Sequence, residues 1–78
     1  MESRKNIILD LNGIIHPLAL LKVSEAFRNI KNGESIEILT ESHETRKDIF
    51  RVLNASCFGL IEISEKGSVY RIILRKNR

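Results

Sequence analysis

The apolar residues of this chain switch between two spacings along its length, and this alternation constrains the fold more than any other feature. Runs rich in β-branched residues, some of them alternating apolar and polar, predict strands at residues 6–11, 35–40, 58–64 and 69–75. Between them, residues 17–31 and 43–55 place apolar side chains every three to four positions, which predicts helices. The predicted order is strand, helix, strand, helix, strand, strand.

Short signals mark the ends of these segments. Pro17 suits the first position of a helix because its missing N–H would have no partner there, and His16 is then predicted as the N-cap residue. Ser42 is predicted to cap the second helix. Gly67 suits a tight hairpin turn between the last two strands. These signals agree with the periodicity, so the segment order rests on two kinds of evidence.

The apolar stripes of the helices predict how the segments pack. Two strand–helix–strand units imply right-handed crossovers and parallel pairing, whereas the closing hairpin makes the last strand antiparallel. Two helices cover one face of a four-stranded sheet, so we expect an α/β (α+β) two-layer sandwich forming a single domain over residues 1–78. The predicted core face of the helices comprises Leu20, Val23, Phe27, Ile30, Ile49, Val52 and Leu53.

Length and composition limit the classes of function. A chain of 78 residues has a thin core, which excludes a large enclosed active site built from this chain alone. The single cysteine, Cys57, excludes an intrachain disulfide and favours a reducing compartment. No apolar run is long enough to span a bilayer and the start lacks the apolar stretch of a signal peptide, so we expect a cytoplasmic protein without a membrane partner.

The segment from Leu9 to Pro17 resembles the opening motif of the TusA/SirA family of small sulfur-carrier proteins. In that family a strand, an Asp and a Gly three residues on precede Cys-Pro-x-Pro at the start of the first helix. The resemblance covers about residues 7–76 and implies a mixed sheet of strand order 1-2-4-3 with both helices on one face. Further similar segments are Asn32-Gly33-Glu34, Lys47-Asp48-Ile49, Tyr70-Arg71 and Leu74-Arg75-Lys76.

One departure from the family pattern bears on function. The family cysteine carries sulfur as a persulfide between a cysteine desulfurase or rhodanese-like donor and the next carrier, for tRNA thiolation or sulfur oxidation. Here His16 stands at the cysteine position and Ala19 replaces the second proline. Imidazole does not hold a transferable sulfane sulfur as a thiolate does. Whether the chain is an enzyme therefore stays open.

The resemblance then implies a protein-interaction or regulatory module of a sulfur-relay system, without sulfurtransferase activity of its own. Its expected partner is a cysteine desulfurase-like, rhodanese-like or other sulfur-relay protein. The helix start and the apolar pair before it form the expected docking site. The predicted binding residues are Asp10, Gly13, Ile14, Ile15, His16 and Pro17.

Three alternatives remain open. Cys57 could carry the persulfide of an active sulfur carrier, although the predicted topology places it at the pole opposite His16. His16 and His43 could bind a metal together with Asp10, but two histidines without regular spacing are a weak signal, and we expect no metal or other cofactor.

The third alternative is a small RNA-binding domain. The net charge is +3, but residues 6–72 contain eight basic and nine acidic side chains, so the positive excess lies at the two ends. A solvated tail explains that distribution better than a binding surface, and nucleic acid is not the expected partner. The basic residues concerned are Arg4, Lys5, Arg71, Arg75, Lys76 and Arg78.

Overall fold

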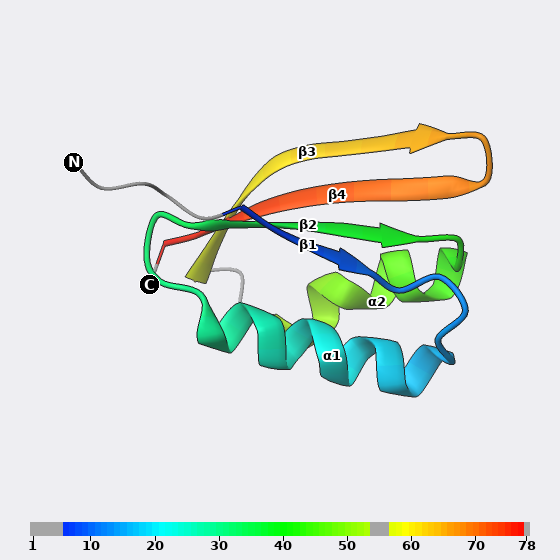
Figure 1. Ribbon diagram of the computed structural model, residues 1–78, viewed down its shortest axis with the longest axis horizontal. Helices are drawn as coiled ribbons and strands as arrows, with labels where there is room; N and C mark the ends of the chain where they lie inside the picture. Colours follow the sequence, from blue (N-terminus) through cyan, green and yellow to red (C-terminus); the bar gives the residue numbers. More distant parts are fainter. Residues whose placement is uncertain (1–5, 54–56, 78) are drawn as a thin grey trace.

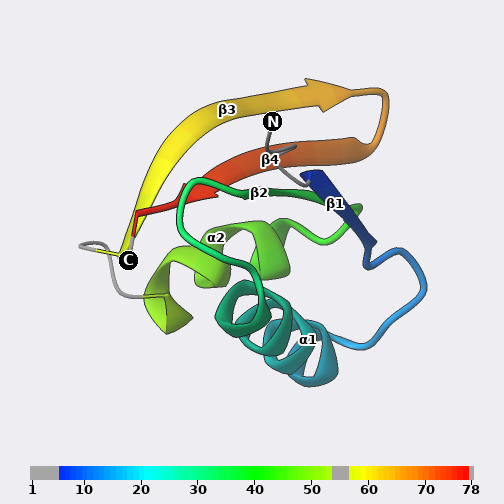
Figure 2. The ribbon, with the colours of Figure 1, turned by 60° about the vertical axis from the view of Figure 1, so that its left-hand side comes forward.

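The computed structural model describes residues 6–53 and 57–77, which form a four-stranded mixed sheet with both helices on one face (Figures 1 and 2). The sheet order is β1-β2-β4-β3, which confirms the predicted fold class. The elements follow the predicted order: β1 (Asn6–Asp10), α1 (His16–Asn29), β2 (Ser35–Thr40), α2 (His43–Val52), β3 (Phe58–Lys66) and β4 (Val69–Lys76).

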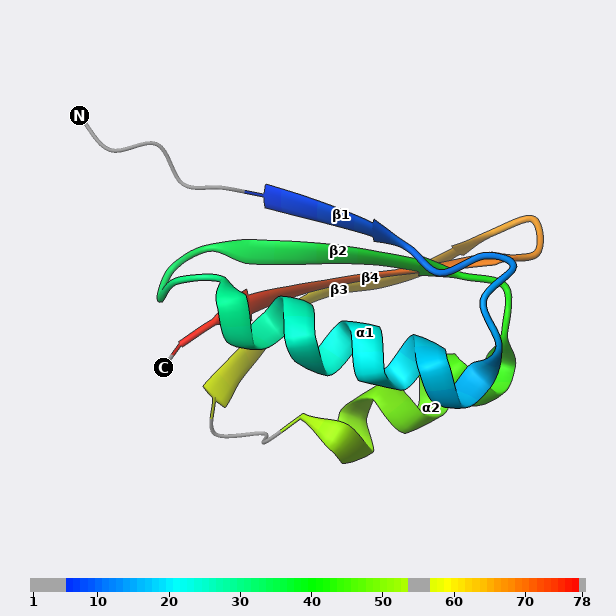
Figure 3. The ribbon, with the colours of Figure 1, turned by 60° about the horizontal axis from the view of Figure 1, so that its bottom comes forward.

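Strand pairing sets where the loops meet. β1 and β2 are parallel, from Asn6 opposite Ser35 to Asp10 opposite Leu39. β4 is antiparallel to both β2 and β3. Because parallel strands end at the same edge of a sheet, the loops that lead into α1 and α2 emerge side by side, and the two helices start at the same end of the molecule (Figure 3).

The core lies between the sheet and the two helices. β2 alternates strictly, with Ile36, Ile38 and Thr40 buried, because alternate side chains of a strand point to opposite faces. No helix in the described part of the chain is long and apolar enough to cross a membrane. The buried apolar residues are Leu11, Ala19, Val23, Phe27, Ile30, Ile36, Ile38, Ile49, Leu53, Ile72 and Leu74.

Two details of α1 differ from the sequence predictions. The N-cap residue is Ile15, whose φ of −64° and ψ of 149° are extended, and its side chain makes no capping hydrogen bond. The prediction of His16 as N-cap was therefore wrong: His16 is the first helical residue and Pro17 the second. α1 also ends at Asn29, two residues before the predicted end.

α2 is shorter than predicted, and a different set of its side chains faces the core. It ends at Val52, and the predicted end at residue 55 lies outside the described residues. The core contacts fall on Ile49 and Leu53, which are four residues apart and so lie on one face of the helix. Val52 points away from that face and is 43% exposed, so its prediction as a core residue was wrong.

Candidate functional site

The loop between β1 and α1 is closed by its own backbone. The buried Leu11 donates its N–H to the carbonyl of Leu39 (2.8 Å), and the N–H of Ile14 returns to the carbonyl of Leu11 (3.1 Å). Gly13 has a φ of +83°, a conformation that residues with a Cβ rarely adopt. Asp10 accepts a hydrogen bond from the N–H of Asn12 (3.0 Å). The loop is thereby folded before α1 begins.

His16 joins the start of α1 to α2 through both of its ring nitrogens. Nδ1 lies 3.0 Å from Oγ1 of Thr45, and Nε2 lies 3.1 Å from Oδ2 of Asp48. In the neutral ring, a proton on Nε2 donates to the carboxylate, and Nδ1 accepts from the threonine hydroxyl. The His16 side chain is 26% exposed, so these two hydrogen bonds are partly shielded from water.

This arrangement limits the chemistry that His16 can perform. Both nitrogens already have partners on α2, so neither is free to bind a metal or an anion. The three side chains follow the acid–imidazole–hydroxyl order of a hydrolase triad, but Thr45 is only 1% exposed. A buried hydroxyl cannot meet a substrate, so the cluster acts as a structural clamp.

Sequence reasoning did not anticipate the roles of Thr45 and Asp48. The available signal was their spacing of three residues on the predicted second helix, which places both on one helical face. The sequence could not show that His16, 29 residues before Thr45, would meet that face.

The start of α2 is itself well supported. The hydroxyl of Ser42 accepts from the N–H of Thr45 (3.1 Å), which confirms the predicted cap, and the N–H of Ser42 donates to Oγ1 of Thr40 (3.1 Å). Asp48 also faces Nε of Arg51 at 3.6 Å. The two threonines and the serine fix the end of β2 and the first turn of α2, which hold the partners of His16.

His43 does not join His16. Its Nδ1 lies 3.3 Å from the hydroxyl of Tyr70, on β4. Asp10 is engaged with its own loop. Across residues 6–53 and 57–77, no group of three or more His, Cys, Asp or Glu side chains lies close enough to hold a metal ion. The structure therefore does not gather the residues named for a metal site.

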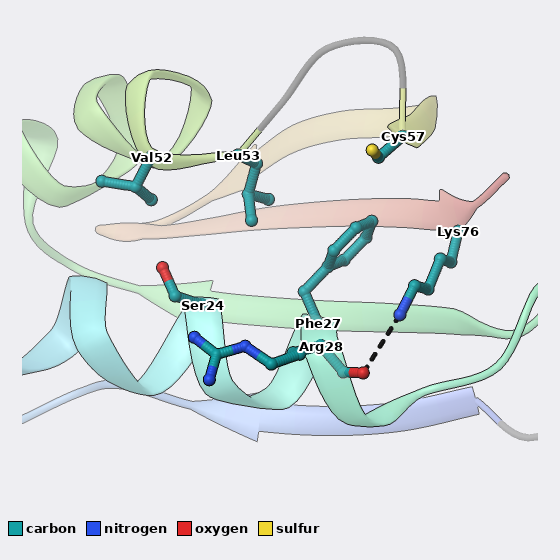
Figure 4. A pocket seen from close by; sticks show the side chains of 7 residues that line it. All are labelled: Ser24, Phe27, Arg28, Val52, Leu53, Cys57 and Lys76. Atoms are coloured by element: carbon teal, nitrogen blue, oxygen red, sulfur yellow. Dashed lines mark hydrogen bonds between the residues drawn. The ribbon is translucent and has the colours of Figure 1, made fainter. Parts of the chain in front are cut away.

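Cys57 lines a pocket of about 320 Å³ between the two helices and the end of the sheet (Figure 4). Its free thiol is half-buried. Nζ of Lys76 donates hydrogen bonds to the carbonyls of Arg28 (3.1 Å) and Ile30 (2.9 Å). Its positive charge therefore lies beside the carbonyl groups at the C-terminal end of α1. The start of β3 and the start of α1 lie at opposite ends of the molecule (Figure 1). The pocket is lined by Ser24, Phe27, Arg28, Val52, Leu53, Cys57 and Lys76.

The predicted basic patch is partly neutralised. Arg71 lies on the open face of the sheet, where its Nε contacts Glu37 at 2.9 Å and its Nη1 contacts Glu62 at 3.3 Å. The hydrogen bond that Arg71 donates to the carboxylate of Glu37 raises the pKa of Arg71 above its usual value. The guanidinium is therefore held by two carboxylates of this chain and is less available to a phosphate. Arg4, Lys5 and Arg78 lie outside the described residues.

Two parallel strands that each lead into a helix on the same face of the sheet, followed by a closing hairpin, define a small two-layer α/β domain. The family model described as "Sulfurtransferase TusA" matches residues 7–76, and the chain belongs to this family.

Individual relatives agree with this assignment. A protein of Archaeoglobus fulgidus named as a candidate sulfur carrier is 23% identical over 70 residues, covering 90% of this chain and 96% of that protein. A similarly named protein of Methanocaldococcus jannaschii is 26% identical over 68 residues, covering 87% and 91%. The crystal structure of a SirA-like protein from Desulfitobacterium hafniense has the same fold, with a TM-score of 0.77 at 16% identity, covering 92% of this chain and 99% of that one.

Proposed function

We propose that this protein is an interaction or regulatory module of a sulfur-relay system that binds a relay protein without carrying sulfur at the family motif. One observation carries the proposal. At the position where the resemblance expects the persulfide cysteine, His16 uses both ring nitrogens to bind α2. Neither nitrogen would form a stable bond to a transferable sulfur, and neither is free.

The surface beside His16 supports a docking role. Ile15 is 70% exposed, and Leu18 and Leu21 on α1 are 44% and 53% exposed. Three exposed aliphatic side chains spaced three residues apart give one flank of α1 an apolar strip that water does not favour. The exposed Lys22 and Glu25 lie on the same face of α1 and carry opposite charges, so the strip has no net charge of its own. The partner that suits this strip has an apolar patch, and we propose a cysteine desulfurase-like or rhodanese-like protein.

A sulfur-loading assay tests the absence of carrier activity. The purified protein is incubated with a cysteine desulfurase and cysteine, and its intact mass is measured without reductant. We expect no gain of sulfur by the wild type. A persulfide on any residue other than Cys57 is excluded chemically, so a Cys57→Ser variant separates the two readings: loading of the wild type that disappears in this variant would contradict the proposal.

A binding measurement tests the docking role. Calorimetry with purified desulfurase and rhodanese-like proteins should detect a complex that Ile15→Glu weakens by roughly tenfold or more, as expected for a buried apolar contact in an interface. Ile8→Glu is the matched control, because Ile8 is 61% exposed but lies on β1, away from the strip. Equal binding by both variants would remove the strip from the interface.

The second candidate function is an active sulfur carrier working through Cys57, in tRNA thiolation or sulfur metabolism. It is favoured by the pocket beside the thiol, in which Arg28 and Lys76 supply positive charge next to a group that reacts as a thiolate. The loading assay above decides between the two candidates.

A further inference from the structure

β3 is an edge strand whose outer side has no hydrogen-bonded neighbour among the described residues. It spans Phe58–Lys66 and pairs with β4 on its inner side only (Figures 1 and 2). Its pairing with β4 shifts register between Leu60 and Glu62, which marks a bulge. The stretch from Glu62 to Lys66 beyond the bulge is regular. An unpaired regular edge is a template for another strand.

The turn fixes which residues of β3 present backbone groups to the open side. Lys66 lies opposite Val69, so the turn contains two residues, and Gly67 supplies the positive φ of +64° that such a turn needs. A two-residue turn is closed by a hydrogen-bonded pair, and these pairs alternate along an antiparallel ladder. Lys66, Ser64 and Glu62 therefore face β4, while Ile63 and Glu65 direct their N–H and C=O groups outward.

We propose that β3 pairs antiparallel with β3 of a second copy of this chain, so that Ile63 of each copy lies opposite Glu65 of the other. A two-fold axis then passes between the two Ser64 residues. This register places Glu62 of each copy opposite Lys66 of the other, in non-hydrogen-bonded positions where facing side chains are closest. Because of the two-fold axis, this ion pair forms twice. The sheets of the two copies then form one continuous sheet.

The charges of β3 select this register over its neighbours. Sliding the strands by one hydrogen-bonding step in one direction places Glu65 opposite Glu65 of the second copy. The next step in the same direction places Lys66 opposite Lys66. Sliding one step in the other direction gives no ion pair. Sliding two steps in that direction places Glu62 opposite Glu62 of the second copy and brings the bulge into the paired segment. Like charges directly opposite each other are destabilising, so one register alone has charge complementarity.

The apolar side chain of Ile63 gives this pairing a second source of free energy. Ile63 lies within the paired segment and is 39% exposed, although it belongs to a strand of the sheet. A second copy along the edge covers part of its surface. The interface is small compared with that of a stable dimer, so we expect a weak, reversible association.

The test is sedimentation of the full chain between about 10 µM and about 1 mM, the range in which a weak dimer changes its population. The wild type should shift from monomer toward dimer as concentration rises. Lys66→Glu and Glu62→Lys should each stay monomeric, because each places like charges opposite each other twice. An equimolar mixture of the two variants should form a heterodimer, since one strand then carries carboxylates and the other ammonium groups at both positions.

Glu65→Lys is the matched control, because it changes the net charge as much as Glu62→Lys but faces Ile63 of the second copy. It should dimerise like the wild type. Far-UV circular dichroism checks the fold of Glu62→Lys, which also loses its contact with Arg71. A wild type that remains monomeric at the highest concentration overturns the proposal. So does a mixture of two folded variants that fails to associate, or a Lys66→Glu variant that dimerises normally.

Discussion

The two ends of this molecule divide what the family motif normally combines. At one end, the loop, the helix start and the capped α2 form the expected setting for a reactive group, but His16 occupies it and is bound to Thr45 and Asp48. At the other end, Cys57 supplies a thiol in a pocket but lies one residue before β3, away from the N-terminus of either helix. One end of the molecule therefore has the helix start without a thiol, and the other end has the thiol without a helix start. Variants can test each end separately.

The largest expected effect comes from placing a thiol at the start of α1, at position 16. His16→Cys in a Cys57→Ser background should gain one sulfur atom on incubation with a desulfurase and cysteine, whereas Cys57→Ser alone should gain none. The helix N-terminus favours the thiolate form of the new side chain. Intact-mass spectrometry measures the change. A folded double variant that is not loaded would mean that the motif end has lost more than its cysteine.

The next effect concerns the clamp itself. Thr45→Val keeps the volume of a buried side chain but leaves Nδ1 of His16 without its partner, so urea unfolding should show a loss of about 1–3 kcal/mol. Thr40→Val is the control, since Thr40 is equally buried but bonds to Ser42. Both variants lose stability, but only Thr45→Val should shift the imidazole resonances of His16. Unchanged resonances would contradict the clamp.

The two helix starts should respond in opposite directions. Ser42→Ala removes the side-chain cap of α2 and should cost about 1 kcal/mol. Ile15→Ser places a hydroxyl at an N-cap that has no side-chain hydrogen bond, and should gain up to about 1 kcal/mol. Thermal unfolding measures both. A loss of stability in Ile15→Ser would show that Ile15 packs within the monomer more than its exposure indicates.

The smallest effect is expected at the rim of the clamp. Arg51 lies 3.6 Å from Asp48 but its side chain is 75% exposed, so water and salt screen the pair. Arg51→Ala should change the free energy of unfolding by less than about 0.5 kcal/mol. A larger loss would show that Asp48 depends on Arg51 to hold His16.

The sequence predicted the element order and the fold because periodicity is a local property. The stripe of α1 and the alternation of β2 specify a face without knowledge of the partner element, and Ser42 was recognised as a cap because its bond spans only three residues. The limits of local reasoning appear at the helix ends. His16 was predicted as the N-cap of α1 but is its first helical residue. Val52 was predicted in the core because periodicity alone does not distinguish it from Leu53.

By itself, the sequence established that Cys57 is the single thiol of the chain, and its resemblance to the TusA/SirA family predicted that His16 stands at the position of the motif cysteine. Only the tertiary structure decided what His16 does there, because its partners lie 29 and 32 residues away on another helix. Local patterns fix which face of an element is buried, but a hydrogen bond between two helices depends on their relative rotation. That rotation is set when both helices pack against the same sheet, and it brings His16 of α1 within hydrogen-bond distance of Thr45 and Asp48 of α2.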